Sequence, residues 1–390
     1  MKKLVSILYL ITATCSISVF AATDSSAKSL NDIMTQVGAT TVDIYPLIVA
    51  QRAFTNKDIE RLDQALEKLS GLFQDAKPFI EKQPEGYQVS YEFISQYLDV
   101  VKTVLHTSHV DYARTHLYAL GEICASCHTQ DSTLRTLFSG TTRKAFADDY
   151  AYAELNYITR DYDDAVKYYE KFLNSPGRKT ELNIIQPLQR IVTIYTQVQN
   201  DPRRGIQVLK KFTTYKQHTP QTLAELNNWI SGLQALVDSG VADISLVTFD
   251  TLQKDVEKYL GNIEHLSVRI ESNAKEEVQR VWLRGQLYHY LNKQAKENEI
   301  PMLLYWLAVV DRSIAYNFYF SLADLYLKHC VLKYPRHPYA KRCFQEFENY
   351  INYTYVNQGE KIPPGINRER IEMQNALDQS QILPAEAVPQ

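Results

Sequence analysis

The sequence predicts an all-α protein, with an up-down four-helix bundle in its N-terminal third and a stack of helical hairpins after it. The 13 Gly and 14 Pro make up about 7% of the 390 residues, against about 12% in an average protein. So few turn-forming residues disfavour β-sandwiches and propellers. Apolar residues also recur three and four positions apart over long stretches, which is the spacing of one buried helix face.

Residues 1–21 have the pattern of a cleavable secretory signal peptide. Lys2 and Lys3 precede a short apolar stretch, and Ala21 ends a cleavage motif of small residues. A retained membrane anchor is the alternative, although the apolar stretch is shorter than the ~20 residues that a membrane span needs. Cys15 leaves a lipoprotein open as well. We expect an exported protein without a membrane span in the mature chain, periplasmic in a bacterium with two membranes, whose cysteines can be oxidised.

Residues 29–142 contain four helical patterns separated by short connections. Short connections make consecutive helices pack antiparallel, as in an up-down bundle. We expect Pro46 to kink the first helix and Asn56 to cap the second. The four patterns are Leu30–Ile48, Ile59–Ile80, Tyr91–Leu105 and a stretch from Asp111 to Phe138.

Residues 145–355 are also helical in pattern but are organised as hairpins. One hairpin, with the small residues Ala153 and Ala165 where its two helices cross closely, resembles a tetratricopeptide unit. A second, less distinct copy of this pattern follows over residues 191–212. We therefore expect a tetratricopeptide-like α-solenoid of stacked hairpins. Residues 357–390 are polar and contain prolines, so we expect them to form a disordered tail.

The five residues Cys124-Ala-Ser-Cys127-His128 form the C-x-x-C-H pattern by which haem is attached to a protein covalently. On a helix the two thiols share a face and add to the two vinyl groups of a haem, while His128 projects toward the iron as its proximal ligand. A thioredoxin-like dithiol is one alternative, but it needs a neighbouring βαβ unit. A zinc site is another, but no second pair of ligands follows nearby. The pattern therefore predicts one covalent haem c.

The motif lies late in the fourth predicted helix of an exported bundle, directly after Leu120-Gly121-Glu-Ile. In this placement it resembles the class II c-type cytochromes, which are the cytochrome c-prime family and its low-spin relatives. The resemblance covers residues 29–140 and implies an electron carrier. Members of this family commonly carry an Arg four positions after the axial His. Here that position is Ser132, and Arg135 is the nearest Arg that could hold a haem propionate.

Met34 is the only Met of the predicted bundle and lies in the first turns of the first helix. In an antiparallel bundle the start of the first helix lies beside the end of the fourth, so the levels of Met34 and His128 agree within about two turns. Residues 34–38 also resemble the segment in which low-spin members of this family carry their Met ligand. Met34 is therefore the candidate distal iron ligand, with core packing as the alternative.

Cys330 and Cys343 flank the segment Tyr334–Pro338 almost symmetrically. A turn there would bring two antiparallel helices together with the thiols opposite each other. In an oxidising compartment we expect a structural disulfide that ties this hairpin together. Two buried thiols are the alternative.

These features predict an exported monohaem c-type cytochrome that transfers single electrons, catalyses no reaction, and docks a redox protein partner through its repeats. One alternative is a five-coordinate haem that senses or binds NO or CO. Another is a repeat scaffold or assembly factor with an accessory haem. The net charge of −3 disfavours nucleic acid as a partner. The sequence leaves open a dimer, the electron donor and acceptor, and the redox potential.

Overall fold

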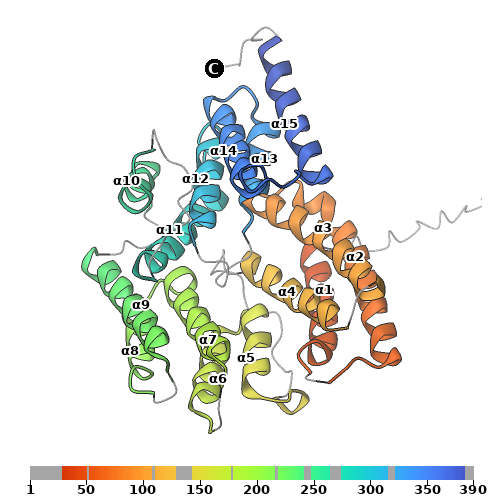
Figure 1. Cartoon of the computed structure of the whole chain (residues 1–390), viewed down its shortest axis with the longest axis vertical. Coiled ribbons are helices and arrows are strands. Elements are labelled where there is room, and N and C mark those ends of the chain that lie inside the picture. Colours follow the sequence, from red (N-terminus) through yellow and green to blue (C-terminus); the bar gives the residue numbers. More distant parts are fainter. Residues whose placement is uncertain are drawn as a thin grey trace, which may run out of the picture.

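The part of the chain that this computed structural model describes is all-helical and contains no strand, as the sequence predicts (Figure 1). None of the helices in the described ranges combines the length and the apolar character needed to cross a bilayer. The predicted signal peptide, residues 1–21, lies outside the described residues. The structure describes residues 29–50, 52–107, 110–128, 143–176, 179–215, 218–240, 247–263, 274–314 and 321–382.

The first four helices pack each against the next, and α1 also contacts α4. Thr55 caps α2 by accepting a hydrogen bond from the backbone of Asp58, whose carboxylate bonds back to Thr55. The prediction that Asn56 is the cap was therefore wrong by one residue, since Asn56 is already helical. Residues 129–142, over which the fourth helix was expected to continue, lie outside the described residues. The helices are α1 (Leu30–Ile48), α2 (Asn56–Ile80), α3 (Glu85–Thr107) and α4 (Val110–His128).

The predicted hairpin around Ala153 and Ala165 is present, because α5 (Asp149–Ile158) and α6 (Tyr162–Asn174) pack along one another. Both alanines are fully buried. Arg160 takes a left-handed conformation in the turn between the helices, with φ of 70°. The small side chains therefore lie in the tightly packed part of the hairpin, as expected.

A second turn repeats this arrangement forty positions later in the chain. Asn200 is left-handed, with φ of 48°, and Asp201 caps α8 (Pro202–Lys210) as Asp161 caps α6. Gly205 occupies the position that corresponds to Ala165. A Cβ atom at Gly205 would lie 3.0 Å from the Cβ of Tyr195, so this crossing also requires a very small residue.

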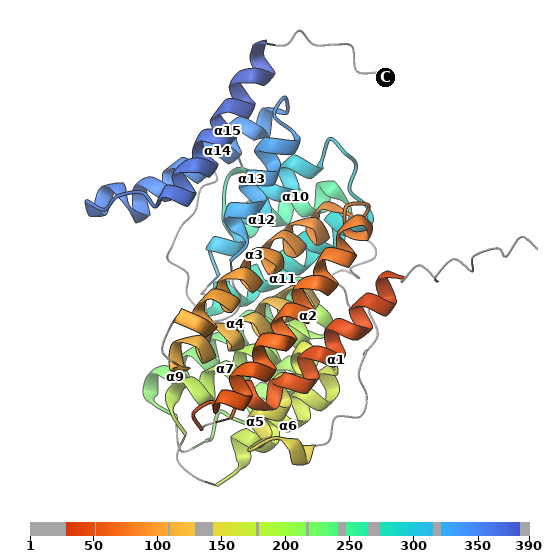
Figure 2. The ribbon, with the colours of Figure 1, turned by 90° about the vertical axis from the view of Figure 1, so that its right-hand side faces the viewer.

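The remaining helices continue the chain of packed neighbours and then return to the bundle. Helices α11 and α13 both contact α3, so segments from the two ends of the chain lie together (Figures 1 and 2). These helices are α7 (Glu181–Thr193), which continues as the π-helix η2 (Ile194–Val198), α9 (Pro220–Asp238), α10 (Phe249–Leu260), α11 (Ala274–Lys293), α12 (Ile300–Arg312), α13 (Ala323–Lys333) and α14 (Pro338–Thr354).

The prediction of a disordered tail at residues 357–390 is wrong for Pro364–Ile382, because these residues form α15. This helix packs on α13 and α14, and Figures 1 and 2 show it at the end of the molecule. Met373 is fully buried and Leu377 is 8% exposed. These two residues lie four positions apart on one helix face, a stripe too short to stand out in a polar stretch.

Candidate functional site

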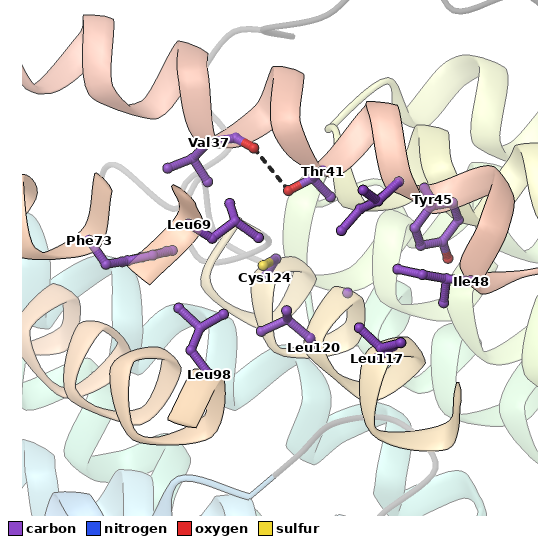
Figure 3. Close-up of a pocket in the computed structure, with 12 residues that line it drawn as sticks. Val37, Thr41, Tyr45, Ile48, Leu69, Phe73, Leu98, Leu117, Leu120 and Cys124 are labelled. Atoms are coloured by element: carbon purple, nitrogen blue, oxygen red, sulfur yellow. Dashed lines mark hydrogen bonds between the residues drawn. The ribbon is translucent and has the colours of Figure 1, made fainter. Parts of the chain in front are cut away.

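The inner face of α4 lines an apolar cavity between the four N-terminal helices (Figure 3). Cys124 lies among side chains of α1, α2 and α4 in this view, with Thr41 on the facing helix. The Thr41 hydroxyl donates to the Val37 carbonyl at 2.9 Å, so its polar hydrogen is already used. The cavity is lined by Val37, Thr41, Ile44, Tyr45, Ile48, Leu69, Phe73, Leu98, Leu117, Leu120, Gly121 and Cys124.

Helices α1 and α4 run antiparallel, and Arg114 fixes their relative position. Its guanidinium donates to the carbonyls of Leu47 at 2.8 Å and Ile48 at 2.7 Å, which ties the start of α4 to the end of α1. His128 follows Arg114 by 14 positions, and Met34 precedes Ile48 by the same number. Because both helices rise by about 1.5 Å per residue, Met34 and the backbone of His128 lie at the same end of the pair, within about one turn in level.

The structure describes the side chains of only some of the residues predicted to bind the haem. Cys124 is half-buried and lines the cavity. Met34 is half-buried and packs on the core one turn before Val37, but it does not line the cavity. The side chains of Cys127 and His128 lie outside the described residues, although both positions belong to α4. Ser132 and Arg135 also lie outside the described residues.

The chemistry of the cavity suits a covalently attached haem, because its walls are almost entirely apolar and a thiol of the motif lines it. Its volume of about 20 Å³ holds roughly one water molecule. A haem is far larger, so binding requires the side chains that line the cavity to move aside. Among the described side chains, no cluster of three or more His, Cys, Asp and Glu could hold a metal ion. The axial ligand that the motif supplies, His128, is not among those side chains.

The outer face of α4 contacts the helical hairpins through a buried ionic network. Arg190 of α7 pairs with Glu122 of α4, and its Nε lies 3.5 Å from Glu154 of α5. The side chains of Arg190 and Glu154 are only 3% and 1% exposed. Burial raises the pKa of Glu122 above its ordinary value, while the charge of Arg190 opposes this shift. We call the group Glu122, Glu154 and Arg190 the arginine interface.

Hydroxyl and amide groups complete the arginine interface. Tyr118 of α4 donates to Glu154 at 2.8 Å, and Tyr169 of α6 donates to the other oxygen of the same carboxylate. Gln186 of α7 donates to Glu122 at 3.0 Å. Glu122 lies two positions before Cys124, which on a helix of 3.6 residues per turn places the two side chains on opposite faces. The network therefore holds the outer face of α4 while Cys124 faces the cavity.

Cys330 and Cys343 lie in α13 and α14 and are joined, with Cα atoms 6.4 Å apart, as the sequence predicts. This separation is within the usual range for a disulfide. Both residues are fully buried. The bond ties α13 to α14 and lies outside the cavity.

Comparison with known proteins gives no match. No family model, no curated protein and no solved structure is similar to this chain. The candidate site therefore depends on the C-x-x-C-H motif and on the position of Cys124 in the packed helices.

The arginine interface was missed by sequence reasoning. Arg190 is 68 positions from Glu122 and 36 from Glu154, so no local pattern links them. One signal was available: Glu154 lies in the same tightly packed helix as Ala153, where a charged residue needs a buried partner.

Proposed function

We propose that α1–α4 form a haem-bearing bundle of the class II cytochrome type and that the protein is an exported single-electron carrier, periplasmic in a bacterium with two membranes. The observation that carries the proposal is the position of Cys124, a thiol of a C-x-x-C-H motif, on an apolar cavity inside packed helices. An attached haem would be enclosed there on several sides. A C-x-x-C pair that serves as a dithiol at the surface does not need an apolar cavity beside it, whereas a haem does.

The residues of this chain would then have distinct roles. Cys124 and Cys127 would hold the haem through thioether bonds, and His128 would bind its iron. The bound haem supplies reversible one-electron chemistry at the iron. The apolar side chains around the cavity exclude water from the macrocycle. Met34 is the candidate sixth ligand, and ligation by it would leave no open position on the iron, which suits electron transfer more than catalysis.

We assign helices α5 to α14 to a tetratricopeptide-like module that docks a redox protein partner. Two features support this. The turns at Arg160 and Asn200 are equivalent and lie forty positions apart, and small residues recur at Ala165 and Gly205. Stacked hairpins of this type present extended surfaces on which proteins bind.

The test is a haem stain of the denatured protein, expressed in a cell that attaches c-type haem. The wild type should stain after denaturing electrophoresis, and the double variant Cys124→Ala, Cys127→Ala should not. The matched control is Cys330→Ala, Cys343→Ala, which removes the same number of cysteines and should keep the stain. A double variant at Cys124 and Cys127 that stains like the wild type would exclude attachment at this motif.

A second candidate function is the binding of NO or CO by a five-coordinate haem. It is favoured by one observation: Met34 lies at the correct end of the bundle but does not line the cavity. A wild type that binds CO at once in its reduced form, with a high-spin spectrum, would support this candidate.

A further inference from the structure

The bundle and the C-terminal helices meet at a partly buried cluster of charged side chains between α3 and α13. His329 of α13 lies between two carboxylates of α3, Glu85 and Glu92. Its Nδ1 bonds to Glu85, and its Nε2 lies 2.8 Å from Oε2 of Glu92. Only 7% of the His329 side chain is exposed. Both ring nitrogens therefore contact acidic groups, and the contact with Glu85 is buried.

With both carboxylates ionised, as the lowered pKa values of Glu85 and Glu92 favour, this geometry requires the charged form of the histidine. An ionised carboxylate only accepts hydrogen bonds, so each ring nitrogen must donate, and both nitrogens donate only in the imidazolium. Burial alone lowers the pKa of His329, but its hydrogen bonds to Glu85 and Glu92 outweigh burial and raise the pKa above its ordinary value. The hydrogen bond from His329 likewise lowers the pKa of Glu92 to about 2.

The surrounding charges balance only when His329 is protonated. Lys333 lies 2.8 Å from Glu85, and Lys328 lies 3.3 Å from Glu92 and 3.4 Å from Glu369 of α15. Within ion-pair distance, three carboxylates thus face two lysines and His329. The other polar and titratable groups that act on this cluster are Gln88, which accepts from Lys333, and Tyr334 and Glu372, which lie near Glu85 and Lys328.

We propose that His329 is a pH-sensitive clasp that holds the C-terminal helices on the bundle and releases them when it loses its proton. The disulfide of the adjacent Cys330 ties α13 to α14, so both helices are held through the same contact. In a neutral His329 one ring nitrogen is an acceptor, and it then faces a carboxylate oxygen that is also an acceptor. The cluster is also left with an excess negative charge. Release would uncover the face of α3 that α13 covers.

The direction of the pH dependence follows from the raised pKa. A group whose pKa is higher in the folded state stabilises the contact fully below its ordinary value of 6.5. The stabilisation is lost as the pH rises through the folded-state value. The clasp is therefore closed below pH 6.5 and opens as the pH rises through the folded-state pKa of His329. This inference does not depend on the presence of a haem.

Hydrogen exchange of the full-length protein between pH 6 and 9 tests the clasp, after correction for the intrinsic pH dependence of exchange. Protection of amides in α3 and α13 should fall by up to about tenfold per pH unit between the ordinary pKa of 6.5 and the folded-state pKa, because opening releases one proton in that window, and it should level off above the window. Amides in α5 and α6 should keep their protection. His329→Gln should lower the protection of α3 and α13 at pH 6 and remove its pH dependence.

Two further variants make the result decisive. Glu92→Gln removes one carboxylate from His329 and should move the midpoint of the transition to lower pH. His106→Gln is the matched control, since His106 forms a 2.8 Å contact with Asp63 at the surface, and it should behave as the wild type. Protection of α3 and α13 that stays constant from pH 6 to 9, or a Glu92→Gln midpoint equal to that of the wild type, would overturn the proposal.

Discussion

The bundle contacts the rest of the chain through two buried ionic interfaces that differ in one chemical property. At the arginine interface, α4 is held by Arg190, whose guanidinium stays charged throughout the physiological pH range. At the other interface, α3 is held by His329, whose charge depends on pH. Both cations lie between two carboxylates and are almost fully buried. The contact made by Arg190 is therefore permanent, whereas the contact made by His329 can be released.

The arginine interface should show the largest effect. Arg190→Met leaves Glu122 and Glu154 without their cation in a buried position, so we expect a loss of about 3–5 kcal/mol in the free energy of unfolding. Urea unfolding at pH 7 and pH 9 measures the loss, which should not become smaller at pH 9, because arginine does not titrate in this range. The triple variant Arg190→Met, Glu122→Gln, Glu154→Gln is the control and should recover part of the loss. A loss below about 1 kcal/mol for Arg190→Met would contradict a structural role for the network.

The disulfide stabilises only the helices at the interface that contains His329, and not those at the arginine interface. The double variant Cys330→Ala, Cys343→Ala removes a cross-link between residues 13 positions apart, and a loop of this length contributes about 3 kcal/mol. Thermal unfolding measures the loss. Exchange protection should fall in α13 and α14 and remain in α4 and α5. Equal loosening on both sides would show that the two interfaces are not independent.

His329→Gln should have a smaller effect, and one that depends on pH. We expect it to cost about 2 kcal/mol at pH 6, where hydrogen bonds between charged groups are lost. The difference from the wild type should shrink as the pH rises through the folded-state pKa of His329, since the wild type loses the same interaction there. Urea unfolding at several pH values measures both numbers. A cost that is constant with pH would mean that His329 acts by packing alone.

Met34→Ala should have the smallest effect on stability, about 1 kcal/mol, because Met34 is only half-buried. Its effect on the haem should be larger. We expect a six-coordinate low-spin haem to become five-coordinate, to bind CO readily when reduced, and to have a lower redox potential, because thioether ligation favours ferrous iron. Absorption spectra and CO titration of the two reduced proteins measure this change. Identical spectra would assign Met34 to the core.

Local patterns in the sequence predicted most of the helices and one cross-link. The spacing of apolar residues predicted the first three helices and the start of the fourth, and Ala153 and Ala165 predicted a closely packed hairpin. Cys330 and Cys343 were recognisable because a turn lies midway between them. Each of these signals is carried by residues that are close in the chain.

The two ionic interfaces were not predictable in the same way. His329 is 244 positions from Glu85, and Arg190 is 68 from Glu122. Only the packing of distant helices brings these charges together. The sequence around each residue does not indicate which distant residue it pairs with. The short stripe of Met373 and Leu377 in α15 failed as a signal for a related reason, since its burial depends on α13 and α14.

The intact mass of the denatured, purified protein shows directly whether a haem is attached covalently to α4. We expect a mass equal to the mature chain plus one haem, with the added mass on the proteolytic peptide that contains Cys124 and Cys127. Cys124→Ala, Cys127→Ala should show the mass of the chain alone. A wild type with the mass of the bare chain, from a cell that attaches haem to other c-type cytochromes, would mean that α4 carries no covalent haem.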